Sequence, residues 1–141
     1  MSEDDDQFQA WLMDMGDAIE RLMNSLPAEI SRKMDFTAES LSPVEHFCLA
    51  RYPSATEAKE LSEAKTIDSI ARYVGQVFRK NLGGKWFIDF SDPKNAFYGL
   101  PQLSGMTGQD TQICPLSLVI ASLDRRTGKF LRTVYESHLE T

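Results

Sequence analysis

Hydrophobic residues recur at helical spacing over the first 26 positions of the chain, at intervals of 4, 3, 4, 3 and 4 residues. This spacing puts their side chains on one face of an amphipathic helix, which we expect to end before Pro27. The face must be covered. We expect it to pack within its own domain, with a homodimer formed through this helix as the alternative. The face consists of Phe8, Leu12, Met15, Ile19, Leu22 and Leu26.

Apolar residues at helical spacing predict four later helices. Serine and proline mark where several of them begin, because serine caps a helix well and proline suits its first turn. The predicted ranges are about 40 or 42 to 52, 67–82, 115–124 and 129–139.

Two glycines indicate where the predicted 67–82 helix ends and where it packs closely against a neighbour. Gly83 suits the position just after a helix end, because glycine readily adopts a positive φ. Gly75 lies on or near the apolar face of the same helix, where glycine weakens helix propensity. Close packing against a neighbouring element is the simplest reason for a glycine at that position.

Alternating residues after this helix predict a small antiparallel sheet. Trp86–Phe90 and Ala96–Leu100 read as the two strands of a hairpin, and the turn-forming residues between them support this. A short alternating run, Met34–Thr37, is a possible edge strand. We therefore expect an α+β fold with a small antiparallel sheet packed against several helices. One domain is predicted over 1–141, with an N-terminal amphipathic helix at 1–26 and an α+β core at 34–139.

Composition and charge exclude several functional classes. The 141 residues carry a net charge of −6, which disfavours nucleic-acid binding and docking on anionic membranes. No apolar run is long enough for a membrane-spanning helix, and the acidic start lacks the apolar core of a signal peptide. We expect a cytoplasmic protein, with Cys48 and Cys114 as buried thiols rather than a disulfide.

The sequence shows no arrangement typical of catalysis, so we assign no catalytic residue, metal ligand or cofactor and lean against an enzyme. Leu82-Gly83-Gly84-Lys85 resembles a phosphate loop only superficially. A phosphate loop needs its glycines before a helix, where amide N–H groups face the anion, whereas here the helix comes first. No metal-binding spacing or serine nucleophile motif is present.

The run from Tyr73-Val74-Gly75-Gln76-Val77 to Leu82-Gly83-Gly84-Lys85-Trp86 resembles a group of small bacterial proteins of unknown function. Members carry Tyr-x-Gly-Glu-Val, a basic pair, Leu-Gly-Gly-x-Trp and a later helix opened by proline, and the resemblance covers about 34–135. The chain departs from the pattern at Gln76, where the group has Glu. The resemblance implies an α+β fold and a bacterial cytoplasmic protein. Some members resemble immunity proteins encoded beside toxins or companions of large secreted systems.

Two functional hypotheses follow. The first is a non-catalytic protein-binding domain, immunity-like or scaffold-like. The second is a small-ligand binder or unrecognised enzyme with a pocket between helix 67–82 and the 85–100 hairpin. Candidate ligand- or partner-binding residues are Tyr73, Arg79, Trp86 and Tyr98. The polar segment 101–113 is expected to act as a lid or contact loop.

Overall fold

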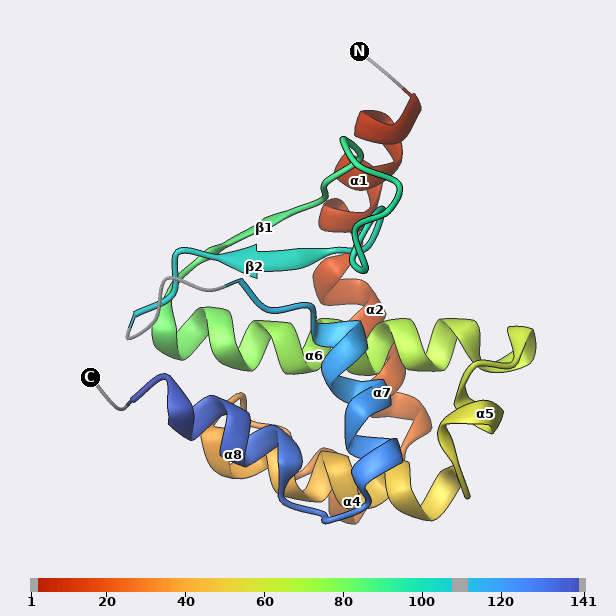
Figure 1. Cartoon of the computed structure of the whole chain (residues 1–141). Coiled ribbons are helices and arrows are strands. Elements are labelled where there is room, and N and C mark those ends of the chain that lie inside the picture. Colours follow the sequence, from red (N-terminus) through yellow and green to blue (C-terminus); the bar gives the residue numbers. More distant parts are fainter. Residues whose placement is uncertain (1–2, 108–111, 140–141) are drawn as a thin grey trace.

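The computed structural model describes residues 3–107 and 112–139, and helices make up most of it (Figure 1). Strands β1 (Lys85–Phe87) and β2 (Gln102–Ser104) form an antiparallel pair, so the predicted α+β class is confirmed. Short 3-10 helices η1 and η2 span Ala38–Ser40 and Leu61–Glu63. The α-helices are α1 (Glu3–Met13), α2 (Met15–Ser25), α3 (Ala28–Ser31), α4 (Leu41–Arg51), α5 (Ala55–Ala58), α6 (Ala64–Leu82), α7 (Pro115–Arg125) and α8 (Phe130–Ser137).

Helix α6 is the centre of the fold, and α2 and α7 pack against it. Most of its middle is buried, with Val74, Val77 and Phe78 fully buried. Helix α7 crosses α6 and leads to α8, which lies beside α4 at the bottom of Figure 1. Gly83 ends α6 with φ of 82°, as predicted.

The predicted helix over the first 26 residues is in fact two helices, broken at Asp14. Arg72 of α6 donates a hydrogen bond of 2.7 Å to the carbonyl of Trp11 at the end of α1, which takes this acceptor out of the helical ladder. Helix α2 buries its apolar face against α6, as expected for packing within one domain. Helix α1 buries no residue and extends beyond the body of the molecule (Figure 1).

The predicted hairpin has the wrong second strand. Trp86 of β1 pairs with Leu103 of β2, whereas residues 96–100 form turns. Side-chain oxygens of Asp89, Asp92 and Asn95 each accept a hydrogen bond from the backbone N–H two residues later. Such local bonds compete with strand pairing, so the chain winds through successive turns before it can return to the sheet.

The proposed edge strand at Met34–Thr37 is also wrong, because Phe36 has φ of 64°, which an extended strand cannot contain. The N–H of Phe36 donates to the hydroxyl of Tyr73, and its carbonyl accepts from Asn81. These contacts with α6 hold the residue in its unusual conformation. The segment therefore packs on the helix instead of joining the sheet.

The predicted contact segment 101–113 is only partly loop. It begins with β2, and Ile113 forms an antiparallel bridge to Leu103. Residues 108–111 of this segment lie outside the described residues, so a lid or contact role there stays a prediction.

His138, directly after α8, gives the fold an expected pH dependence. Its side chain is buried against Phe78, and within the described ranges its Nδ1 has no hydrogen-bond partner. Burial lowers the pKa of His138 below its usual value of 6.5. The unfolded chain therefore binds a proton at higher pH than the folded chain. The stability that depends on neutral His138 should therefore be fully present above about pH 6.5. It should decline as the pH falls below this value.

Urea unfolding at pH 7.5 and pH 5.5 tests this expectation. Replacing His138 by Gln should remove part of the stability difference between the two pH values, at most about 1.4 kcal/mol per pH unit. The exposed His46, replaced by Gln, serves as the matched control and should leave the difference unchanged. An identical pH difference in His138→Gln and the wild type would show that His138 does not cause it.

Candidate functional site: the α6–α7 groove

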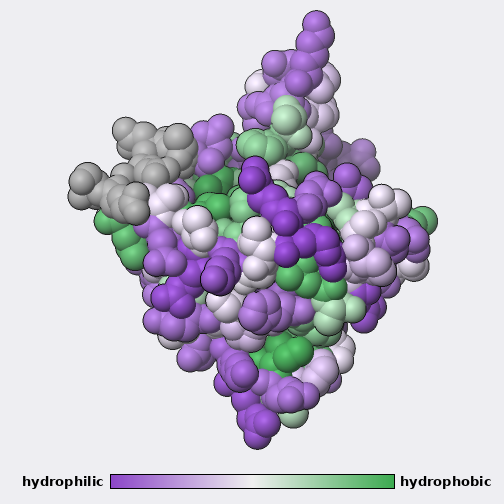
Figure 2. All heavy atoms as spheres, turned by 60° about the horizontal axis from the view of Figure 1, so that its bottom comes forward, coloured by the Kyte–Doolittle hydropathy of each residue, from purple (hydrophilic) through white to green (hydrophobic). Residues whose placement is uncertain are grey.

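A groove of about 550 Å³ lies where α7 crosses the N-terminal half of α6, and we call it the α6–α7 groove. Its floor comes from these two helices, and most of its lining is apolar. The lining consists of Trp11, Ala58, Lys59, Glu60, Ala64, Ile67, Asp68, Ala71, Trp86, Leu100, Pro101, Pro115, Leu116, Ser117, Ile120, Ala121 and Asp124. The face of the molecule shown in Figure 2 is mostly hydrophilic, with separate hydrophobic patches.

Two tryptophans from distant parts of the chain form one wall of the groove. The rings of Trp11 and Trp86 meet edge to face, with centroids 4.9 Å apart. The indole Nε1 of Trp86 donates to the Oε1 of Gln76 at 2.9 Å. Beneath the ring, a Cβ built on Gly75 would lie 2.1 Å from Trp86 Cη2. The close packing predicted for Gly75 is therefore confirmed, and Trp86 is the neighbour.

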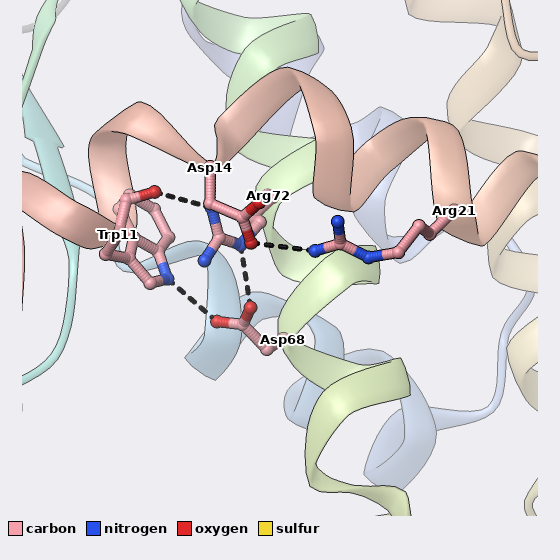
Figure 3. A network of polar contacts seen from close by, with 5 residues as sticks. All are labelled: Trp11, Asp14, Arg21, Asp68 and Arg72. Carbon is pink, nitrogen blue, oxygen red and sulfur yellow. Dashed lines mark hydrogen bonds and ion pairs between the residues drawn. The ribbon is translucent and has the colours of Figure 1, made fainter.

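A polar network holds Trp11 in this wall (Figure 3). Arg72, only 4% exposed, lies over the Trp11 ring with its Cζ 4.2 Å from the ring centroid. Its Nε bonds Asp68 at 2.7 Å, and the Nε1 of Trp11 donates to the other Asp68 oxygen at 2.9 Å. Asp14 lies beside this network and pairs with Arg21. The network fixes the end of α1, which packing alone does not bury.

Carboxylates outnumber cations along the groove. Asp68 is already paired with Arg72, so its charge is largely compensated. Glu60 and Asp124 have no ion-pair partner in the part of the chain that the structure describes, and Lys59 is the only cation in the described lining. The groove therefore combines an apolar floor with a weakly negative rim.

A second hollow, which shares only Trp86 with the lining of the groove, is here named the Trp86 notch. It has a volume of about 320 Å³. In contrast to the groove, its charged lining residues are both basic. The lining consists of Leu12, Met15, Gln76, Arg79, Lys85 and Trp86.

The four predicted site residues divide into two groups. Arg79 and Trp86 come together in the notch, and Trp86 also lines the groove. Tyr73 is fully buried, where its hydroxyl donates to Ser40 and accepts from the N–H of Phe36, so its role is structural. Tyr98 meets the ring of Phe90 edge to face and lines neither hollow.

Sequence reasoning missed most of the groove. Neither Trp11 nor α7 residues such as Leu116 and Ile120 were among the candidate binding residues, although all of them line the groove. Their actual position depends on the crossing of α7 over α6, for which the sequence offers no local signal. The pocket was predicted between helix 67–82 and an 85–100 hairpin, whereas the groove lies between this helix and α7, with residues 100–101 at its side.

Cys48 and Tyr52 lie in surroundings that keep their side chains protonated. Both cysteines are free and buried, as predicted, and burial raises the pKa of Cys48 to about 12, which keeps it protonated. Burial also raises the pKa of Tyr52 to about 12, and its hydroxyl donates to Glu63. Across residues 3–107 and 112–139, no three His, Cys, Asp or Glu side chains are grouped to hold a metal ion.

No protein-family model matches this chain, and no curated protein or solved structure matches it significantly. None of the helices in the described ranges has the length and hydrophobicity needed to cross a bilayer. The geometry of the groove and the notch is therefore the basis for assigning a function.

Proposed function

We propose that the protein is a non-catalytic binding domain whose α6–α7 groove holds an amphipathic segment of a protein partner. The observation that carries the proposal is the groove itself, an apolar hollow of about 550 Å³ between two crossing helices. Grooves of this kind accept the apolar face of a helical segment, whose anchors recur at three- and four-residue intervals.

Charge defines the partner segment further. Glu60 and Asp124 are unpaired among the described residues at the rim, and the chain carries a net charge of −6. A segment with lysine or arginine beside its apolar anchors complements both features, and the net charge would also speed its association. The two tryptophans supply the large rigid contact surface that interfaces favour.

The biological setting belongs to the same proposal. The resemblance at Tyr73–Trp86 supports an immunity-like or scaffold role in the bacterial cytoplasm. Two free buried cysteines are consistent with a reducing compartment. The α2 face that could have formed a homodimer packs on α6 instead, so we place the partner surface on the groove.

Filling the groove with charge tests the proposal. Ser117 and Ala121 are half-buried residues of α7 that line it. The double variant Ser117→Arg/Ala121→Arg should lose a bound partner when the tagged protein is purified from its own cells at low salt. Thr133→Arg on the exposed face of α8 is the control and should retain the partner. A partner that stays bound to the double variant at wild-type stoichiometry would place the interface elsewhere.

A small apolar ligand is the second candidate occupant, because the groove volume falls within the range of about 300–1,000 Å³ typical of ligand pockets. The two hypotheses differ in what the purified protein binds. A partnerless protein whose melting temperature rises with a small planar molecule, and not in Ser117→Arg/Ala121→Arg, would favour this second function.

A further inference from the structure

We propose that the Trp86 notch is a binding site for a carboxylate carried on an apolar body. This site shares only Trp86 with the lining of the α6–α7 groove and does not depend on what the groove binds. The proposal rests on three observations: two unpaired cations, an apolar wall, and an amide with a fixed orientation.

The cations come first. Arg79, in the last turn of α6, and Lys85, the first residue of β1, both line the notch. The turn through Gly83 and Gly84, which have φ of 82° and 107°, brings the strand back beside the helix. Neither side chain has an ion-pair partner in the described part of the chain, although the protein has an excess of acidic residues. Among the residues that the structure describes, no carboxylate lines the notch, so none of these residues competes there with an anion from outside.

The rest of the lining is suited to an apolar group. Leu12 at the end of α1, Met15 at the start of α2 and the ring of Trp86 supply the apolar surface. The position of these walls is fixed, because Met15 is buried and Gly75 leaves room for the Trp86 ring. An apolar body placed here would remove additional hydrophobic surface from water.

Gln76 adds a polar group of defined orientation. Its Oε1 accepts from Trp86 Nε1, so its amide N–H₂ remains available as a donor on a residue that lines the notch. A carboxylate at Arg79 can accept two parallel hydrogen bonds from the guanidinium. Lys85 adds a second positive charge, and Gln76 adds a neutral donor.

This combination favours a monoanionic carboxylate over inorganic phosphate. A phosphate dianion is strongly hydrated and gains nothing from Leu12, Met15 or Trp86. Two sources could supply the favoured group, a free aliphatic carboxylate or the C-terminal carboxylate of a protein chain that ends in an apolar residue. Both share the chemistry that the notch recognises.

Titration of the ¹⁵N-labelled full chain, followed at the Trp86 indole N–H signal, tests the site. The probes are octanoate for the free source and N-acetylleucine for a chain terminus. Each is compared with its neutral counterpart, octanol or N-acetylleucinamide. At least one carboxylate should shift the signal saturably, with a dissociation constant on the order of 1 mM for a ligand of this size. The neutral counterparts should bind at least tenfold more weakly.

Variants separate the site from the net charge of the protein. Arg79→Gln/Lys85→Gln should weaken carboxylate binding by at least about tenfold. Lys94→Gln/Lys129→Gln removes two exposed cations outside the notch and should leave binding unchanged. Binding to only one of the two carboxylates identifies the source.

Four results would overturn the proposal: no saturable shift with either carboxylate, equal binding of octanol, equal binding of inorganic phosphate, or undiminished binding in Arg79→Gln/Lys85→Gln. Because no partner protein takes part, none of these results bears on whether the groove holds a partner segment.

Discussion

Replacing Glu45 by alanine is expected to lower the free energy of unfolding by about 3 kcal/mol, because it removes the acceptor for two buried hydrogen bonds. Glu45 lies on α4 with 0% of its surface exposed. Its Oε1 accepts from the N–H of Leu131 at 2.8 Å and its Oε2 from the N–H of Phe130 at 3.1 Å. These are the first two residues of α8, whose N–H groups have no partner within the helix. The negative charge also suits the positive end of the helix dipole.

Urea denaturation measures the loss of stability in Glu45→Ala, and two further variants serve as comparisons. Glu45→Gln keeps one carbonyl acceptor and should give an intermediate loss. The exposed Glu29 in the first turn of α3 is the control, and Glu29→Ala should change stability by less than about 0.5 kcal/mol. If Glu45→Ala unfolds within about 0.5 kcal/mol of the wild type, the carboxylate does not hold α8 in place.

Replacing Gly75 by alanine is the second change with a large expected effect. The new Cβ would lie 2.1 Å from Trp86 Cη2, 2.5 Å from Trp86 Cζ2 and 3.0 Å from Pro115 Cγ, so the indole must move. Displacement breaks the bond to Gln76 and disturbs both the groove and the notch. We expect a loss of about 2 kcal/mol from overpacking, even though alanine gains about 1 kcal/mol in helix propensity.

Gly16 provides a matched control, because a Cβ there meets nothing within 4 Å. Gly16→Ala in α2 should stabilise the protein by up to about 1 kcal/mol. Urea denaturation gives both stabilities, and the tryptophan emission should shift to longer wavelength only in Gly75→Ala, as Trp86 becomes more exposed. A Gly75→Ala protein as stable as Gly16→Ala, with unchanged emission, would contradict the close packing of Trp86 on α6.

Local signals predicted the parts of the fold that local interactions determine. The apolar periodicity of 67–82 gave α6 to within three residues at its start, and Gly83 gave its end, because both depend on neighbours in sequence. The break at Asp14 was not predictable in this way. It depends on Arg72, which lies 61 residues from Trp11 along the chain and binds its carbonyl.

The sheet and the site show the same limit. The alternation of apolar and polar residues identified β1. The next segment forms turns, in which the side chains of Asp89 and Asp92 accept backbone hydrogen bonds, so the second strand begins only at residue 102. Tyr73 looked suitable for a pocket because it is polar and aromatic, yet Ser40 and Phe36 satisfy its hydroxyl inside the core. Arg79 and Trp86 were found together because only a short glycine turn separates helix from strand.

Site-specific photo-crosslinking tests the role of the α6–α7 groove most directly. A photoreactive benzoylphenylalanine at position 117 of α7 would sit in the groove, and the same residue at position 133 of α8 would sit outside it. After irradiation in the protein's own cells, the account predicts a crosslink from position 117 only. The attached peptide should contain apolar residues at helical spacing beside lysine or arginine. No protein crosslink at position 117, or the same crosslink from position 133, would contradict the groove as the docking surface.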